Sequence, residues 1–178
     1  MSRPIEEVWR FFHDVPQVAA CLPGAEYLGA GENGRHLGKV SAKLGPFQAS
    51  FEGEAELRYD EERKSVVLDG KGVDRKGASR GKMTMACTLQ RSGAATAVVV
   101  DSDVQLSGSI AQFGRTGLIT EIANVLISDF VSNAEAVLQA RHTATAAPRP
   151  AAAQPIGSFA LALAALRAWL KARFSRTP

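Results

Sequence analysis

The sequence predicts one α+β domain, in which a curved antiparallel sheet wraps around a long C-terminal helix, followed by a linker and an amphipathic tail helix. Two observations carry this prediction: side chains alternate between apolar and polar through residues 25–107, and apolar residues then recur at helical spacing from 117 to 140. Because the connections between the alternating segments are short, neighbouring strands pair as a meander, which twist curves around one face. The long helix has a wide apolar face that must pack on a sheet, and this is the only sheet available.

The first residues have the pattern of two short helices. Ser2 is placed to cap the first helix, whose apolar face is formed by Ile5, Val8, Trp9 and Phe12. Asp14 and Pro16 then mark a break, and a second short helix is expected over residues 17–21. A Pro-Gly pair at 23–24 ends it.

Six strands follow, and their apolar positions define the inner face of the sheet. The clearest strand is 47–59, and the others are expected at 26–30, 35–44, 65–73, 82–89 and 98–106. The inner positions mix large, adaptable residues with very small ones, for example Phe51 and Met83 beside Gly53 and Ala55. Small residues on a concave face leave volume, and methionines suit irregular apolar shapes. This pattern has two interpretations: the volume beside the small residues is a ligand cavity, or the long helix fills it completely.

The composition excludes several classes of protein. With 46% hydrophobic and 22% charged residues in a chain of 178, the composition is that of a globular protein. Two cysteines, Cys21 and Cys87, are too few for a disulfide framework or a four-ligand zinc site. No apolar run is long enough to span a bilayer, and the first residues lack the apolar core of a signal peptide, so we expect residence in the cytoplasm.

We predict no catalytic residues and no metal site. The strand carboxylates lie in the polar, solvent-side register; these are Glu52, Glu54, Glu56, Asp101 and Asp103. Cys21 and Cys87 are expected to be packed core residues, and His36 to make a polar contact toward the inner face. No glycine-rich phosphate loop and no cluster of metal ligands is present.

The C-terminal segment differs from the rest in composition. We expect the folded domain to cover residues 1–141, an Ala- and Pro-rich linker 142–157, and a basic amphipathic helix 158–178. The first 141 residues carry 16 basic and 18 acidic side chains, whereas residues 142–178 carry five basic and no acidic ones. This favours a helix lying on an anionic membrane surface over one that folds back on its own domain or pairs with a partner helix. The expected membrane contacts are Phe159, Leu163, Leu166, Arg167, Trp169, Leu170, Lys171, Arg173 and Phe174.

A basic cluster and the pI near 9.1 raise the question of nucleic-acid binding. The cluster consists of Lys71, Arg75, Lys76, Arg80 and Lys82. No nucleic-acid-binding motif accompanies it, so we expect no nucleic acid, and interpret the cluster as a solvated loop or a contact with an acidic partner protein.

Several short motifs together resemble one protein family. They are Glu7-Val8-Trp9, Cys21-Leu22-Pro23-Gly24-Ala25, Gly45-Pro46-Phe47, Phe51-Glu52-Gly53 and the segment Gly108–Arg115. The combination, which spans nearly all of residues 5–138, is similar to the CoxG family, named for the G subunit of carbon monoxide dehydrogenase. The order of elements is similar to the helix-grip fold of the START-like (SRPBCC) superfamily.

This resemblance implies a non-catalytic accessory protein of a molybdenum-containing CO dehydrogenase or a relative, held at the cytoplasmic face of the cell membrane. The superfamily fold implies a cavity for an apolar molecule and no covalent cofactor. We expect a respiratory quinone first and another isoprenoid or acyl lipid second. The protein would recruit the enzyme to the membrane, supply it with quinone, or do both. The expected ligand contacts are Leu22, Val40, Phe47, Phe51, Met83, Met85, Val100, Phe113, Leu118, Ile122 and Leu126.

Two alternative functions stay open, and one feature of the sequence departs from the family pattern. The chain could be a cyclase-type enzyme of the same fold acting on an apolar substrate, or a factor needed only for maturation of the molybdenum enzyme. Family members usually begin with an edge strand, whereas here Met1 stands almost at the first helix. Either the start is assigned too late or the strand is missing, and a missing strand would leave a sheet edge that invites pairing with another chain.

Overall fold

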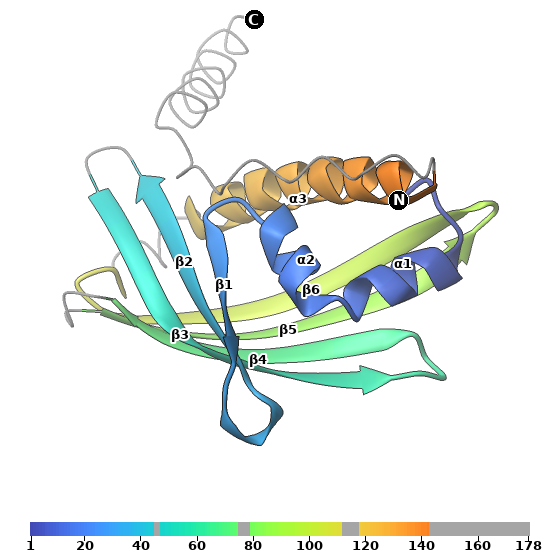
Figure 1. Cartoon of the computed structure of the whole chain (residues 1–178). Helices are drawn as coiled ribbons and strands as arrows, with labels where there is room; N and C mark the ends of the chain where they lie inside the picture. Colours follow the sequence, from blue (N-terminus) through green and yellow to red (C-terminus); the bar gives the residue numbers. More distant parts are fainter. Residues whose placement is uncertain (45–46, 75–78, 112–117, 143–178) are drawn as a thin grey trace, which may run out of the picture.

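The computed structural model of the chain describes residues 1–44, 47–74, 79–111 and 118–142. These residues form a six-stranded sheet with three helices on one side of it (Figure 1). The two short helices, α1 and α2, precede the sheet, and the long helix α3 follows it. The predicted α+β fold, a curved antiparallel sheet with a long C-terminal helix, is confirmed.

The sheet is an antiparallel meander with the strands in chain order. The strands are β1 (Ala25–Ala30), β2 (His36–Leu44), β3 (Phe47–Asp60), β4 (Ser65–Asp74), β5 (Ser79–Ser92) and β6 (Ala95–Gly108), with a short 3₁₀ turn at Glu32–Gly34 between the first two. Each agrees with an expected strand, and β5 and β6 run several residues further because their ladder continues without interruption from Ser79 to Ser92.

The helices are α1 (Ile5–Phe12), α2 (Val15–Cys21) and α3 (Leu118–His142). The predicted Ser2 cap is wrong: α1 begins after Pro4 without a side-chain cap. The Ser2 backbone N–H donates instead to Glu135 Oε1 at 2.6 Å, which ties the start of the chain to α3. Asp14 caps α2 by accepting a hydrogen bond from the Gln17 N–H at 3.3 Å.

The hydrophobic core lies at one end of the sheet. We call the side of the sheet that faces α3 the concave face and the opposite side the convex face. On the concave face, α1 lies near the β3–β4 turn and the β5–β6 turn, while α2 contacts β1 and α3. The buried core residues are Ile5, Val8, Trp9, Phe11, Phe12, Cys21, Val66, Cys87, Leu89, Ala134, Val137 and Leu138.

Gly24 in the Pro-Gly pair has a structural reason to be glycine. Its φ of +78° is a left-handed conformation that a residue with a side chain adopts only under strain. A Cβ there would also lie 2.1 Å from the Ser41 carbonyl oxygen, and the Gly24 carbonyl accepts a hydrogen bond from the Ser41 N–H at 2.8 Å. The turn from α2 into β1 therefore packs directly on β2.

Four glycines stand opposite one another across β2, β3, β4 and β5: Gly38, Gly53, Gly72 and Gly81. A Cβ at Gly53 would lie 2.0 Å from the Lys71 carbonyl oxygen and 2.7 Å from Gly72 Cα. At Gly53 the small residue therefore lets two backbones approach closely. This corrects the expectation that Gly53 leaves free volume on the inner face.

Candidate functional site

Five expected ligand contacts on the strands, Val40, Phe51, Met83, Met85 and Val100, lie on the concave face. Val40 of β2 is directly opposite Phe51 of β3, and Met83 of β5 is opposite Val104 of β6. Met85 shares the register of the buried Cys87, whose cross-strand neighbour is Val100. Cross-strand partners in an antiparallel pair point to the same face, so these side chains all lie on the concave face. They form two apolar groups, Val40 with Phe51 on β2 and β3 and the residues of β5 and β6, with glycines of β3, β4 and β5 between them.

This apolar surface is only partly covered. Val40, Val100 and Val104 are 44%, 38% and 40% exposed, although Val100 stands opposite Cys87 of the buried core. Phe51, Met83 and Met85 are half-buried. Single exposed apolar residues are normal, but a group of them on a concave face marks a candidate binding surface.

The remaining expected ligand contacts belong to α3, the end of α2 and the start of β3, or lie outside the described residues. Ile122 and Leu126 are half-buried on α3, and Leu22 is half-buried where α2 ends. Phe47 is the first residue of β3, and Leu118 is the first residue of α3. Phe113 lies outside the described residues, as do all the expected membrane contacts between 159 and 174.

One polar pair lies on the concave face beside these residues. Tyr27 and His36 both have their cross-strand partners on this face, and the Tyr27 hydroxyl is 3.3 Å from His36 Nδ1. Both side chains are half-buried. The expected polar contact of His36 is thus with Tyr27, a residue that sequence reasoning did not single out.

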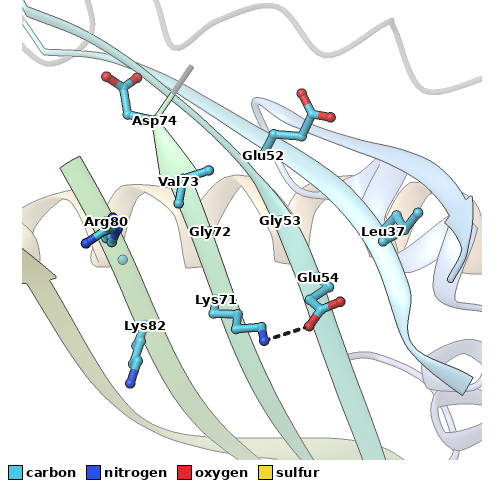
Figure 2. Close-up of a pocket in the computed structure, with 11 residues that line it drawn as sticks. Leu37, Glu52, Gly53, Glu54, Lys71, Gly72, Val73, Asp74, Arg80 and Lys82 are labelled. Carbon is cyan, nitrogen blue, oxygen red and sulfur yellow. Dashed lines mark ion pairs between the residues drawn. The ribbon is translucent and has the colours of Figure 1, made fainter. Parts of the chain in front are cut away.

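A separate hollow of about 820 Å³ opens on the convex face, around the glycines of β3, β4 and β5 (Figure 2). Its walls include Leu37, Val73 and the long side chains of Lys71, Arg80 and Lys82. In Figure 2, α3 lies behind the strands. None of the eight expected ligand contacts whose side chains the structure describes lines this hollow, so it is a feature separate from the concave surface.

In the wall of the convex hollow, one acidic side chain lies between two basic ones. Glu54 accepts from Arg35 at 2.5 Å and pairs with Lys71 at 2.9 Å. The hydrogen bond from Lys71, followed by the charge of Arg35, lowers the pKa of Glu54. Lys71 stands directly opposite Lys82, and both are exposed, which fits the interpretation of the basic cluster as a solvated surface. Arg75 and Lys76 of that cluster lie outside the described residues.

A polar and aromatic cluster at the closed end of the sheet was not expected from the sequence. The Trp9 indole N–H donates to Glu61 at 2.7 Å, and the His13 ring stacks on Tyr59 with centroids 4.1 Å apart. The Tyr59 hydroxyl donates to the Phe12 carbonyl at 3.0 Å. These contacts anchor α1 to the β3–β4 turn, which is a structural role.

Both cysteines are free and buried, as expected. Burial raises the pKa of the Cys21 thiol and of the Cys87 thiol to about 11 in each case. Such thiols are protonated near neutral pH and make poor nucleophiles. Among residues 1–44, 47–74, 79–111 and 118–142, no group of three or more His, Cys, Asp and Glu side chains is arranged to hold a metal ion.

Thiol chemistry tests this burial. Because each thiol ionises only near pH 11, both should react with a disulfide reagent at pH 8 far more slowly than in denaturant. Since the thiolate is favoured only in the unfolded chain, unfolding should become easier as the pH rises from 9 toward 11. A colorimetric thiol assay with and without urea checks the first expectation. Two rapidly reacting thiols in the native protein would contradict it.

The model of the CoxG family, described as the G subunit of carbon monoxide dehydrogenase, matches residues 1–139. The chain belongs to the CoxG family. It is thus a member of an accessory-subunit family of the CO dehydrogenase system. The match ends close to the expected end of the folded domain. A search of curated proteins finds no significant match.

Solved structures share the fold of this CoxG-family protein at low sequence identity. A conserved protein from Geobacillus kaustophilus has a TM-score of 0.64 and 18% identity, over 80% of this chain and 90% of that chain. The TTHA0849 protein from Thermus thermophilus has a TM-score of 0.55 and 18% identity, over 81% and 92% of the two chains. The Zhui aromatase/cyclase from Streptomyces sp. R1128 has a TM-score of 0.48 and 16% identity, over 83% and 92%. The first two likenesses concern the fold alone.

Three residues of the motifs that carried the family resemblance have a role in folding. Trp9 packs in the core, Gly24 forms the tight turn onto β2, and Gly53 permits the close approach of β4. Within the part of the chain that the structure describes, no helix has the length and hydropathy needed to cross a bilayer.

Proposed function

We propose that this CoxG-family protein is a non-catalytic accessory protein that binds an apolar molecule on its concave face and holds a molybdenum CO dehydrogenase-type enzyme at the cytoplasmic face of the membrane. The observation that carries the proposal is the partly uncovered apolar surface formed by Val40, Phe51, Met83, Val100 and Val104. A ligand in contact with this surface would remove it from water, which contributes about 25 cal/mol for each Å² buried.

A respiratory quinone suits the surface best. Its isoprenoid chain matches the apolar strand residues and the flexible methionines. Its carbonyl oxygens need a hydrogen-bond donor, and the Tyr27–His36 pair supplies one on the same face. Another isoprenoid or acyl lipid would use the apolar surface without needing this pair.

The membrane tether is proposed from the sequence of residues 158–178, which lie outside the described residues. Phe159, Leu163, Leu166 and Leu170 recur at helical spacing, with Arg167 and Lys171 beside them. An amphipathic helix of this kind lies in the membrane interface and gains about 1 kcal/mol for each cation near anionic lipid.

An enzyme of the same fold is the second candidate, because His36 and Tyr27 place a titratable pair beside an apolar surface. Turnover of an apolar substrate that is lost in His36→Ala would support it. The pKa of about 11 makes Cys87 a poor nucleophile in such a reaction. A maturation factor would be recognised by a different observation. The molybdenum enzyme, once assembled, would work without it.

Ligand binding is tested by organic extraction of the purified full chain followed by mass spectrometry, and by titration with a short-chain quinone. Val40→Asp places a carboxylate on the concave surface and should weaken quinone binding by about tenfold or more. Val73→Asp is the matched control, because Val73 is 50% exposed on the convex face. A protein without any co-purifying lipid and without quinone binding would contradict the proposal, and so would equal losses in the two variants.

A further inference from the structure

The convex hollow contains positive charges that have no partner in the described part of the chain. Lys71 of β4 stands directly opposite Lys82 of β5, and Arg80 lies two residues before Lys82 on the same face. Like charges in opposite positions of a ladder repel each other. Lys71 pairs with Glu54 at 2.9 Å, whereas neither Arg80 nor Lys82 forms an ion pair with a described residue. An anionic group bound among these side chains would relieve the repulsion.

The neighbouring strand β6 does not neutralise these charges. Gln105 stands opposite Lys82, and Ser107 stands opposite Arg80. Arg80 and Lys82 are both exposed, so a molecule in the hollow can reach them without a change in the sheet. We call Lys71, Arg80 and Lys82 the basic wall of the hollow.

The acidic side chains of the hollow come from other positions. Glu52 and Glu54 belong to β3, and Asp74 is the last residue of β4. Figure 2 shows Glu52 and Glu54 on the opposite side of the hollow from Arg80 and Lys82. The two sides of the hollow therefore carry opposite charges.

The hollow also exposes two apolar side chains. Leu37 is 38% exposed and Val73 is 50% exposed, and Val73 stands directly opposite Arg80. Between them lies the backbone of the glycines of β3 and β4. An occupant with apolar side chains of its own would remove Leu37 and Val73 from water.

A protein segment matches this combination better than other anions do. A small anion such as phosphate would leave Leu37 and Val73 exposed. An anionic membrane surface carries one sign of charge, so it would be repelled by Glu52, which has no ion pair with a described residue. A peptide chain can direct carboxylates to the basic wall while its apolar side chains cover Leu37 and Val73.

We propose that the convex hollow binds an acidic segment of a partner protein, whose carboxylates contact the basic wall and whose apolar side chains cover Leu37 and Val73. Of the two interpretations of the basic cluster, the unpaired charges favour a contact with an acidic partner over a solvated loop. The inference rests on the proposed function only for the identity of the partner, which is then the molybdenum CO dehydrogenase-type enzyme. Because the ligand surface lies on the concave face, the protein can hold its ligand and this partner at the same time.

The test follows the backbone amides of the full chain by two-dimensional NMR during titration with a synthetic octapeptide of alternating Glu and Leu. We expect saturable shifts of the Lys71, Val73 and Lys82 amides, and added salt should weaken the binding. An octapeptide with Lys in place of Glu should not produce these shifts.

A charge reversal in the basic wall is compared with one outside the hollow. Lys82→Glu should weaken binding of the Glu peptide about tenfold or more. The sheet should be retained, because the new carboxylate stands opposite Lys71. Arg63→Glu is the matched control, since it makes the same charge change on a side chain that is 83% exposed between β3 and β4 and does not line the hollow.

The proposal is overturned by absent shifts, by shifts confined to residues outside the hollow, or by equal losses in the two variants. It is also overturned if Lys82→Glu reduces sedimentation with phosphatidylserine vesicles and leaves peptide binding unchanged, because the hollow would then contact lipid. The peptide is titrated without quinone, so a failure here leaves the ligand proposal standing, and a failure of quinone binding leaves this one standing.

Discussion

Gly53→Ala should destabilise the domain by about 3 kcal/mol or more, which is enough to unfold a large share of a marginally stable protein. The added Cβ would lie 2.0 Å from the Lys71 carbonyl oxygen and 2.7 Å from Gly72 Cα, both of which are backbone atoms. Backbone atoms in the middle of a sheet cannot relieve this clash by a change of rotamer, as a side chain can. The strands β3 and β4 would have to separate, with loss of their hydrogen bonds. Urea unfolding monitored by circular dichroism measures the change.

Gly70→Ala is the matched control. Gly70 lies in the neighbouring strand, opposite Ala55, and an added Cβ would first meet a terminal methyl of Leu68 at 3.4 Å. The substitution should change the free energy of unfolding by less than about 1 kcal/mol, because alanine restricts the unfolded chain and fits the available space. If the two variants were equally stable, the close approach of β3 and β4 would not be a feature of the folded protein.

Deleting residues 156–178 should abolish sedimentation of the protein with anionic vesicles while leaving the domain folded. The deleted segment carries four basic side chains, Arg167, Lys171, Arg173 and Arg176, and no acidic one. At about 1 kcal/mol for each cation, they contribute roughly several hundredfold to partitioning onto anionic lipid. The leucines and Trp169 add an apolar contribution. Sedimentation with vesicles of phosphatidylserine and phosphatidylcholine measures the effect.

The matched control keeps the apolar face and removes charge. Arg167→Gln with Lys171→Gln should weaken binding to anionic vesicles, and raised salt should reduce the difference from the unchanged protein. Sedimentation of the truncated protein at the level of the full chain would contradict the membrane assignment. A truncated domain with a much lower melting temperature would instead indicate that the tail packs on its own domain.

The order of the elements was predictable from the sequence because the hydrophobic period changes twice along the chain. The alternation over 47–59 identified β3, and the helical period after residue 117 identified α3. That α1 has no serine cap was not predictable from the sequence. A serine near a helix start commonly caps the helix, but here the Ser2 backbone N–H donates to Glu135, 133 residues away in the sequence. Only the tertiary contact decides between these roles.

The candidate site was predictable in part for the same reason. Alternation placed Val40, Phe51 and Met83 on one face, and the strand register agrees. The partner of His36 was not predictable, because Tyr27 reaches it from the neighbouring strand across a register shift. The convex hollow was missed as well, since its walls combine side chains of four strands and form only when these strands are paired and curved.

By itself the sequence determined the class of fold, the faces of the strands, the CoxG-family assignment and the contrast between a slightly acidic domain and a basic tail. These are local or compositional properties, which each segment carries without its neighbours. Only the tertiary structure decided where the core closes and why Gly24 and Gly53 must be glycine. Those properties depend on distances between backbones that meet only when the sheet has formed.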